Sequence, residues 1–295
     1  MSVTLLWAAA LLAQPEQLGP SLKFFPTIPC RALDTRLGSD TLLKANEERT
    51  LALPASACGL ATSALAYSMN VTVIPRADFA PSPVDKVTFI QPFLYPVPHQ
   101  PELNPSIRNP EGRVIASHLI VRSDISGSIR VHTTHETHLV IDVNGYWSLN
   151  GPGLDFYGQQ PCRIVDTRVQ SGVSTEAYNT PIDPMLGWPS LQPGEARILP
   201  IGASTRCGPL PESAGAYAVN ITVIPKGILG YLTVWPWSGL PPLTSVLNSL
   251  DGRVTSNSAI VANISGYIAV YATDETDLLV DITGYFGPPT VFPWR

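Results

Sequence analysis

The chain has 295 residues, which at ~100 to 200 residues per domain predicts about two domains. Charged residues make up only 14%, against 30 prolines and 22 glycines, and this composition excludes a long helical or coiled-coil architecture. The net charge of −5 and the scattered basic residues exclude the basic patch that a nucleic acid or an anionic membrane requires. No run of about 18 apolar residues occurs, so we expect no membrane span.

The N-terminal stretch 1–18 contains the apolar run VTLLWAAALLA at 3–13. Its length and its small-residue end are typical of the apolar part of a secretion leader, but no basic residue precedes it, the first being Lys23. We therefore expect either a leader or a retained apolar N-terminal strand, and the sequence leaves both open.

The remainder is one unit written twice, with the matching segments in the same order. The matches are PCRALDTR (29–36) with PCRIVDTR (161–168), AYSMNVTVIP (66–75) with AYAVNITVIP (216–225), and HETHLVIDVNGYW (135–147) with DETDLLVDITGYF (274–286). We predict a first repeat at 19–148, a connector at 149–158 and a second repeat at 159–287.

A third, shorter echo surrounds the repeats. GPSLKFF (19–25) and GPGLDFY (151–157) each precede a PCR motif, whereas GPPTVFPW (287–294) follows the second repeat. The tail at 288–295 therefore resembles a connector with no repeat of its own after it, and we expect it to need a partner.

Strand patterns dominate each repeat. In 66–74 the residues Tyr67, Met69, Val71 and Val73 alternate with small or polar residues, which is the period-2 pattern of a half-buried strand. The further expected strands of the first repeat lie at 31–36, 49–53, 87–91, 118–122, 128–132 and 139–143. The fold class is therefore all-β, with two tandem duplicated β-sandwich domains, jelly-roll or Ig-like, of about seven strands each. A β-trefoil or a small barrel is the alternative.

The four cysteines fall as one pair in each repeat. Four cysteines permit three pairings, and a duplicated domain favours the pairing within each copy, Cys30 with Cys58 and Cys162 with Cys207. Such bonds persist outside the reducing cytosol, so the pairs predict an extracellular or cell-surface protein. A zinc site would need CxxC-type spacing, which is absent.

Together these motifs resemble a tandem repeat common in secreted and surface-attached bacterial proteins, with PCRxxDTR at the start of each unit and a DxxGYF-type end, which reads DVNGYW in the first unit and DITGYF in the second. The second repeat also carries its GxLTxWP turn (230–236) and LNSxDGR segment (247–253), from which the first repeat departs. The resemblance covers both repeats. It implies a structural or accessory module without a defined enzymatic activity.

Candidate chemistry is sparse, and we expect neither an enzyme nor a cofactor. Asp34 with Arg36, and Asp166 with Arg168, lie two residues apart and are expected to form structural ion pairs. Asp142 and Asp281 lie opposite the apolar stripe of each last strand, but no cluster of acids beside aromatic residues supports a glycosidase.

Two further polar sets favour structure over chemistry. His132, His135 and His138 could not converge on a metal from one continuous strand, and we expect a solvated loop tip and no metal site. Asn70 and Asn220 begin glycosylation sequons at the same strand position, and we interpret them as fold residues whose amides bond a neighbouring loop.

The sequence thus favours a non-enzymatic extracellular structural protein that assembles with copies of itself, head to tail, into a filament or surface layer. In this hypothesis the segment 287–295 of one copy occupies the connector region near residues 19–28 of the next, and a retained N-terminal segment could add a strand to a neighbouring sheet. The candidate interface residues are Gly287, Pro288, Phe292, Trp294, Phe24, Phe25, Trp188, Trp235 and Trp237. The alternative is a carbohydrate-binding or adhesive module that binds glycans through the aromatic loops of the second repeat.

Overall fold

The computed structural model of the chain describes residues 21–37, 41–75, 86–90 (backbone only), 106–170 and 183–289. Within them the regular elements are β-strands and two one-turn 3-10 helices, η1 (Leu53–Ala55) and η3 (Ile201–Ala203). The expected all-β class is confirmed. No helix among these residues has the length and apolar character to cross a membrane.

The first repeat contains eight named strands. They are β1 (Lys23–Asp34), β2 (Glu48–Ala52), β3 (Ala66–Pro75), β4 (Lys86–Ile90), β5 (Ile107–Arg108), β6 (Ile115–Arg122), β7 (Ser128–Thr133) and β8 (Thr137–Ser148). The second repeat contains the same number. They are β9 (Asp155–Asp166), β10 (Ala196–Leu199), β11 (Ala216–Pro225), β12 (Leu229–Pro236), β13 (Leu247–Ser249), β14 (Thr255–Ala262), β15 (Ile268–Ala272) and β16 (Thr276–Gly287).

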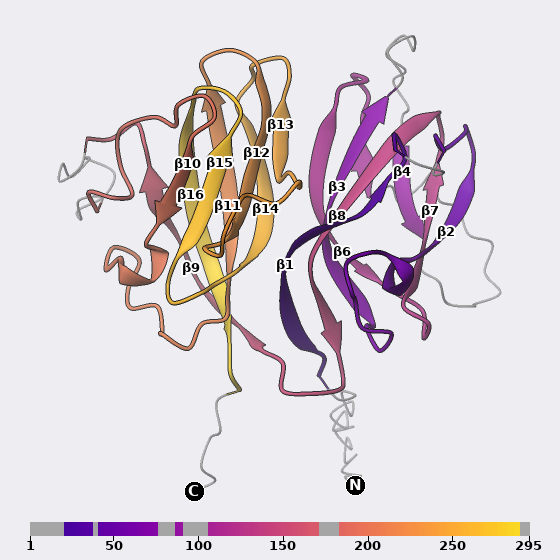
Figure 1. Ribbon diagram of the computed structural model, residues 1–295, viewed down its shortest axis with the longest axis horizontal. Helices are drawn as coiled ribbons and strands as arrows, with labels where there is room; N and C mark the ends of the chain where they lie inside the picture. The colour runs from indigo at the N-terminus through magenta and orange to yellow at the C-terminus, as the bar shows by residue number, and fades with distance from the viewer. Residues whose placement is uncertain (1–20, 38–40, 76–85, 91–105, 171–182, 290–295) are drawn as a thin grey trace, which may run out of the picture.

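The pairing of these strands identifies both repeats as jelly rolls. In the first repeat β1 pairs with β8, β2 with β7, β3 with β6 and β4 with β5, as in a long hairpin rolled onto itself. This produces one sheet of order β1-β8-β3-β6 and a second of order β2-β7-β4-β5. The second repeat has the matching orders β9-β16-β11-β14 and β10-β15-β12-β13. The two sandwiches lie side by side, and the start of β1 and the end of β16 lie at the same end of the molecule (Figure 1).

The alternation seen in the sequence decides which way each strand faces. Tyr67, Met69 and Val71 on β3 are fully buried in the core between the two sheets of the first repeat. The second repeat has an equivalent core, to which β11 contributes Tyr217 and Ile221. Successive side chains of a strand point to opposite faces, so the intervening polar residues lie on the outer face of each sheet. We call these two surfaces the outer face of β1-β8-β3-β6 and the outer face of β9-β16-β11-β14.

Both predicted disulfides are present. Cys30 on β1 is bonded to Cys58, and Cys162 on β9 is bonded to Cys207, each with a Cα–Cα distance of 5.6 Å. Each bond ties the first strand of a jelly roll to the loop after its first 3-10 turn, so the cysteines occupy the same structural position in the two copies.

The segments expected to be connectors are largely strand. Phe24 pairs with Trp147, and Phe156 pairs with Phe286, so each segment forms the start of a first strand paired with the last strand of its own repeat. The expected connector 149–158 is therefore shorter than its sequence boundaries, because β9 already begins at Asp155. Pairing with β8 and β16, with bulges in the register, extends β1 and β9 to the N-terminal side of the PCR motifs.

Candidate functional site

The repeated PCRxxDTR motif builds a compact charge cluster on the first strand. In the first repeat the Asp34 carboxylate accepts two hydrogen bonds from the Arg36 guanidinium, at 2.8 and 2.7 Å. These bonds from Arg36 hold the pKa of Asp34 below its usual range. The Arg31 guanidinium donates at 3.2 Å to the same carboxylate and, in bidentate fashion, at 2.9 and 3.1 Å to Asp142 on β8.

The second repeat reproduces this cluster. Arg168 donates to Asp166 at 2.9 and 2.7 Å, and Arg163 donates to Asp281 at 2.8 and 2.9 Å. The pairs expected from sequence, Asp34 with Arg36 and Asp166 with Arg168, therefore form. Sequence reasoning missed the pairing of Arg31 with Asp142 and of Arg163 with Asp281, although both partners recur at matching positions of the two repeats.

The threonine of the same motif has a local structural role. Thr35 Oγ1 accepts a hydrogen bond from the backbone N–H of Leu139 at 2.9 Å, and Thr167 Oγ1 accepts one from Leu278 at 2.8 Å. Each hydroxyl thereby pairs a backbone donor of the last strand where the first strand ends. In both repeats, therefore, the residues of the PCRxxDTR motif make contacts that stabilise the fold.

The HTTHETH segment spans the end of β7, the turn after it and the start of β8. His138 Nδ1 lies 3.2 Å from Thr35 Oγ1 and 3.1 Å from the Thr35 carbonyl oxygen, so it belongs to the same strand-end contact. Across the described ranges no group of three or more His, Cys, Asp or Glu side chains is placed to hold a metal ion.

The second repeat docks on the outer face of β1-β8-β3-β6 through buried hydrogen bonds. The backbone N–H of Ser245 donates to Asp142 at 3.0 Å, and Asn70 Nδ2 donates to the Ser245 carbonyl at 2.5 Å. Asn257 Nδ2 donates to Asn70 Oδ1 at 2.8 Å, and the His118 N–H donates to Asn257 Oδ1 at 2.9 Å. The Asn70 amide does bond a neighbouring loop, as expected, and that loop belongs to the other repeat.

Burial at this interface shifts the ionisation of two groups. It raises the pKa of Asp142, against the lowering effect of the Arg31 hydrogen bonds. It lowers the pKa of His118 to about 4, so the imidazole is neutral at physiological pH. Its Nε2 lies 2.8 Å from Ser68 Oγ. The interface is thus built around one compensated ion pair and otherwise uncharged groups.

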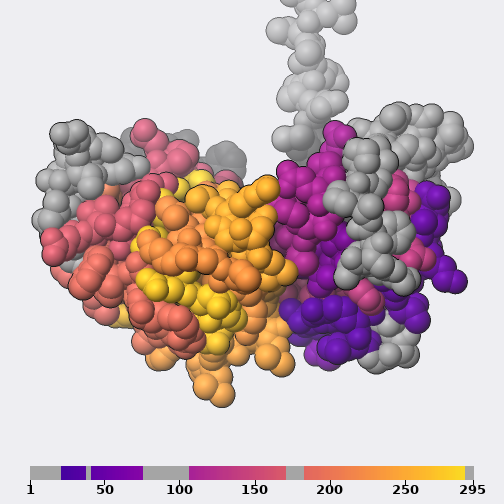
Figure 2. All heavy atoms as spheres, turned by 90° about the horizontal axis from the view of Figure 1, so that it is seen from above, coloured from indigo at the N-terminus to yellow at the C-terminus, as the bar shows by residue number. Residues whose placement is uncertain are grey.

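A reciprocal pair of salt bridges lies at the rim of the interface. Arg113 reaches Asp251 at 3.0 Å, and Arg253 reaches Glu111 at 2.9 Å. The four residues come from the matching EGR and DGR turns of the two repeats, so each turn supplies one acid and one base to the other. In the space-filling view the repeats appear as two lobes that meet along this interface (Figure 2).

An aromatic cluster closes the end of the interface near the chain termini. The Phe24 ring lies 4.7 Å from Trp147 and 4.5 Å from Phe286, measured between ring centroids. The Phe24 backbone also exchanges two hydrogen bonds with Leu154, at 2.9 and 2.8 Å. Phe24 is 0% exposed, so the position near residues 19–28 that was expected to receive a neighbouring copy is filled here by the second repeat of the same chain.

The equivalent outer face of β9-β16-β11-β14 carries side chains of the same types, but several of them are more exposed to solvent. Asp142 has a side-chain exposure of 3%, against 23% for its counterpart Asp281. Phe24 is 0% exposed, whereas its counterpart Phe156 is 54% exposed. On β14 both outward-facing serines, Ser256 and Ser258, are exposed. The face of the first repeat is thus covered around Phe24 and Asp142, whereas the matching part of the second face, around Phe156 and Asp281, is more open. On the edge strands the difference is reversed, since Ile120 on β6 is 61% exposed and Ile260 on β14 is 5% exposed.

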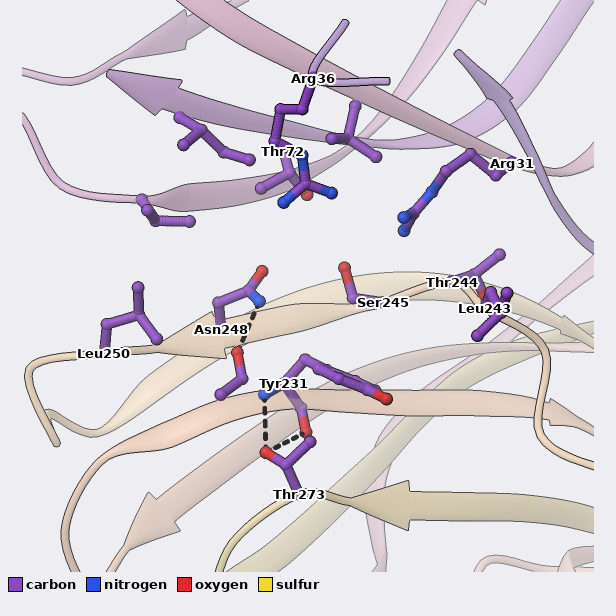
Figure 3. A pocket seen from close by; sticks show the side chains of 14 residues that line it. Arg31, Arg36, Thr72, Tyr231, Leu243, Thr244, Ser245, Asn248, Leu250 and Thr273 are labelled. Atoms are coloured by element: carbon purple, nitrogen blue, oxygen red, sulfur yellow. Dashed lines mark hydrogen bonds between the residues drawn. The ribbon is translucent and has the colours of Figure 1, made fainter. Parts of the chain in front are cut away.

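Two clefts lie along the junction of the repeats. The first, of ≈ 550 Å³, receives Arg31 and Arg36 from the first repeat, opposite Tyr231, Ser245 and Asn248 of the second (Figure 3). We call it the arginine cleft. Both guanidinium groups already hold carboxylates, so the local charge is compensated, and the cleft lacks the excess positive charge that an anion site requires.

The second cleft, of ≈ 370 Å³, lies between β6 and the open outer face. We call it the aromatic cleft. Its aromatic lining consists of Trp147, Phe156 and Phe286, and Ile120 on β6 forms part of its opposite wall. Its polar lining consists of His118, Asn220, Ser258 and Thr283. It is the more apolar site and is the one that borders the unpaired face.

The structure separates the aromatic residues singled out from sequence. Trp235 is 1% exposed and is therefore unavailable as a surface anchor, although it lies on the face of β12 opposite to Val234, which points into the core of the repeat. Trp188 and Trp237 are 59% and 44% exposed. Phe25 stacks on Tyr146 with a centroid distance of 5.2 Å.

The C-terminal residues singled out from sequence are described only up to residue 289. Gly287 pairs with Asp155, and the Pro288 carbonyl accepts a hydrogen bond from the Tyr157 hydroxyl at 2.8 Å. Phe292 and Trp294 lie outside the described residues.

Comparison with known proteins gives a faint likeness of fold only. No family model matches the chain, and no curated protein matches it. Among solved structures, one of Sulfolobus Turreted Icosahedral Virus is 7% identical with a TM-score of 0.21, and the match covers 89% of this chain and 90% of that one. The major capsid protein P2 from bacteriophage PM2 is 8% identical with a TM-score of 0.20, over 93% of this chain and 99% of that one. Likenesses this weak carry no functional conclusion.

Proposed function

We propose that this chain is a non-enzymatic extracellular structural protein that associates with copies of itself head to tail, forming a filament or a surface layer. One observation carries the proposal, namely the unequal cover of two equivalent faces. Within one chain the second repeat covers the outer face of the first around Asp142 and Phe24, and the matching part of the second repeat's face, around Asp281 and Phe156, stays more open. A contact between non-equivalent surfaces that does not close into a ring continues indefinitely.

The distribution of charge supports this function over catalysis. Asp142 is tied to Arg31 and to the Ser245 backbone, and Asp281 is tied to Arg163 in bidentate fashion. A hydrolase built on these residues would require carboxylates free to reach a substrate. The acids of the repeat motif instead orient strand ends and the junction of the repeats.

The two disulfides support the proposed location. Each bond closes a loop within one repeat, with 28 and 45 residues of sequence separation. Disulfides of this kind are retained in oxidising compartments and are rare in the cytosol. An extracellular or cell-surface setting is therefore the one in which both jelly rolls keep their covalent ties.

The test is the size of the particle that the full chain forms. We expect light scattering coupled to size-exclusion chromatography to show species that grow with protein concentration, and negative-stain electron microscopy to show linear or layered arrays. A chain that stays monomeric at all accessible concentrations would rule out the structural role.

A glycan-binding function is the alternative, and the exposed Trp188 and Trp237 favour it. Exposed aromatic rings stack on sugar rings, and these two residues lie in loops of the second repeat. A glycan array with the full chain and with Trp188→Ala and Trp237→Ala variants decides between the two functions. Binding that is lost in these variants, by a chain that remains monomeric, would favour the alternative.

A further inference from the structure

We infer that the aromatic cleft binds the proline- and aromatic-rich segment at residues 290–295, TVFPWR, of a second copy of this chain. The inference rests on the proposed self-association and names the contact that produces it. It starts from a cleft at the junction of the repeats whose lining is aromatic on one side and uncharged and polar on the other.

The repeat comparison shows what kind of group the cleft lacks. Phe24 of the first repeat is enclosed by Trp147, Phe286 and Leu154, and it has no exposed surface. Among the described residues its counterpart Phe156 contacts one aromatic ring, that of Phe286, at 5.1 Å between centroids, and over half of Phe156 is exposed. Burying such a ring in an apolar contact stabilises a complex, because its apolar surface is removed from water. An apolar partner is therefore favoured on this side of Phe286.

The polar lining suits an extended peptide backbone. In the described part of the chain Asn220 makes no side-chain hydrogen bond, whereas its counterpart Asn70 bonds both the Ser245 carbonyl and Asn257. A proline-rich extended segment makes no internal backbone hydrogen bonds, so its carbonyl groups are free to accept from such an amide. Grooves lined by aromatic side chains bind proline-rich extended segments in this way. His118 is neutral and adds no charge to the cleft.

The segment at 290–295 has the matching composition and starts close to the cleft. It contains Phe292, Pro293 and Trp294, and Phe292 stands in the GPxxxF echo at the position of Phe24 and Phe156. Phe286, which lines the cleft, is four residues before Thr290. Six extended residues span about 20 Å, enough to cross a cleft of this size.

The direction of the chain favours a second copy over the segment's own cleft. The cleft runs from Phe286 back over Thr283 and Asn220, whereas the chain continues in the opposite direction through Gly287 and Pro288. Pro288 is followed by Pro289, which disfavours a helical turn at Pro288, and the Pro288 ring fixes the φ angle of Pro288 near −65°. A segment that entered the cleft of its own chain would have to reverse direction directly after these two prolines, which favours the cleft of another copy.

The experiment is a complementation between two variants of the full chain. One variant lacks residues 290–295 and keeps the cleft. The other, Ser258→Trp, keeps the segment and fills the cleft from an exposed position on β14. The control is Ser256→Trp, which adds the same side chain at the other exposed, outward-facing position of that strand, outside the cleft lining. Masses are measured by light scattering.

We expect the full chain and Ser256→Trp to assemble, and each of the other two variants to be monomeric alone. Mixed in equal amounts, the shortened chain and Ser258→Trp should form dimers and no larger species, because only one segment and one matching cleft remain. Dimers that form only in the mixture cannot arise from a segment bound to its own cleft. A mixture that stays monomeric, or a Ser258→Trp chain that assembles like the full chain, overturns the inference.

A second measurement covers the case in which Ser258→Trp fails to fold. Ile120→Asp places a charge on the opposite, exposed wall of the cleft, and Ile125→Asp places one at an exposed position outside it. A fluorescently labelled peptide of residues 287–295 should bind the shortened chain and its Ile125→Asp form, with about tenfold or greater loss for Ile120→Asp. Equal binding to both forms, or no binding, overturns the inference.

The outcomes also separate this contact from the proposed function. If all variants assemble as the full chain does, self-association stands and another occupant, such as the N-terminal apolar run, uses another surface. If the full chain itself is monomeric, the structural function fails, and this inference fails with it.

Discussion

The outer faces of the two repeats differ in what covers them, although their sequences and strand orders match. In the first repeat Asn70 and Asp142 lie under the second repeat, and in the second repeat Asn220 and Asp281 lie on a partly open face. Equivalent residues therefore form a closed contact in the first repeat and a partly accessible surface in the second. In a duplicated chain, one repeat can thus bind a surface of the other repeat. A single contact of this kind uses one of the two equivalent faces and leaves the matching part of the other face more accessible.

The largest difference in stability should appear when the equivalent residues Phe24 and Phe156 are each replaced by alanine. We expect Phe24→Ala to lower the free energy of unfolding by about 3–5 kcal/mol, because a fully buried ring leaves a cavity between the repeats. Phe156→Ala should cost about 1 kcal/mol in the monomer, since over half of that ring is already in water. Urea denaturation of both variants measures this, and equal losses would contradict the asymmetry.

The second-largest difference in stability should appear between variants of the equivalent carboxylates Asp142 and Asp281. Asp142→Ala leaves the Arg31 guanidinium and the Ser245 N–H without their acceptor in a buried place, and we expect a loss of about 3 kcal/mol. Asp281→Ala removes a carboxylate that is 23% exposed, against 3% for Asp142, and that accepts from Arg163 within its own repeat, so the expected loss is about 1 kcal/mol or less. Thermal unfolding by calorimetry compares the pair. A larger loss for Asp281→Ala would reverse the comparison.

The shifted pKa of His118 should give the first repeat a pH dependence of stability that the second repeat lacks at the equivalent position. His118 has a folded-state pKa of about 4, below the ordinary value of 6.5, and its counterpart is Ser258, which does not titrate. The unfolded chain therefore binds a proton that the folded chain does not as pH falls from about 6.5 to 4, and stability falls with it.

We expect this proton to account for about 2 kcal/mol across that pH window. His118→Gln should flatten the pH dependence of the free energy of unfolding there, and His132→Gln should not. A His118→Gln chain whose stability still falls equally between pH 6.5 and 4 would show that burial at the interface does not shift this group.

The smallest effect should come from the rim of the joint. Arg113→Ala and Arg253→Ala each remove one of the two reciprocal salt bridges between the repeats, and both side chains are substantially exposed. We expect each to cost about 0.5 kcal/mol at low salt and less at 1 M salt, where exposed charges are screened. Stability measured at two salt concentrations checks this. A loss above about 2 kcal/mol would mean that the rim, not the buried hydrogen bonds, holds the joint together.

Much of the fold could be predicted because it depends on local patterns. The alternation in 66–74 placed Tyr67 and Met69 in a core, and the duplication paired each cysteine with the one in its own copy. The rolled-up pairing of strand β1 with β8 could not be predicted, because a period-2 pattern specifies which face is buried and not which strand lies beside it. Only the strand pairing in the structure therefore distinguishes a jelly roll from an Ig-like sandwich.

The candidate site was partly visible in the sequence. Asp34 with Arg36 could be paired because they are two residues apart on one strand, whereas Arg31 with Asp142 could not, because 111 residues separate them. Trp235 was expected in an exposed loop, yet it lies on β12 and its side chain is buried. Both misses concern positions whose neighbours come from distant parts of the chain.

The sequence by itself determined that this protein is two copies of one disulfide-tied β unit with ion pairs built into its first strand, because such features depend on spacing and alternation within a short stretch. The tertiary structure alone decided which copy of each repeated residue is buried. Matching segments have matching local preferences, but the water that a side chain loses depends on what packs over it. Here the way one repeat folds back on the other covers Phe24 and Asp142 and leaves Phe156 and Asp281 open.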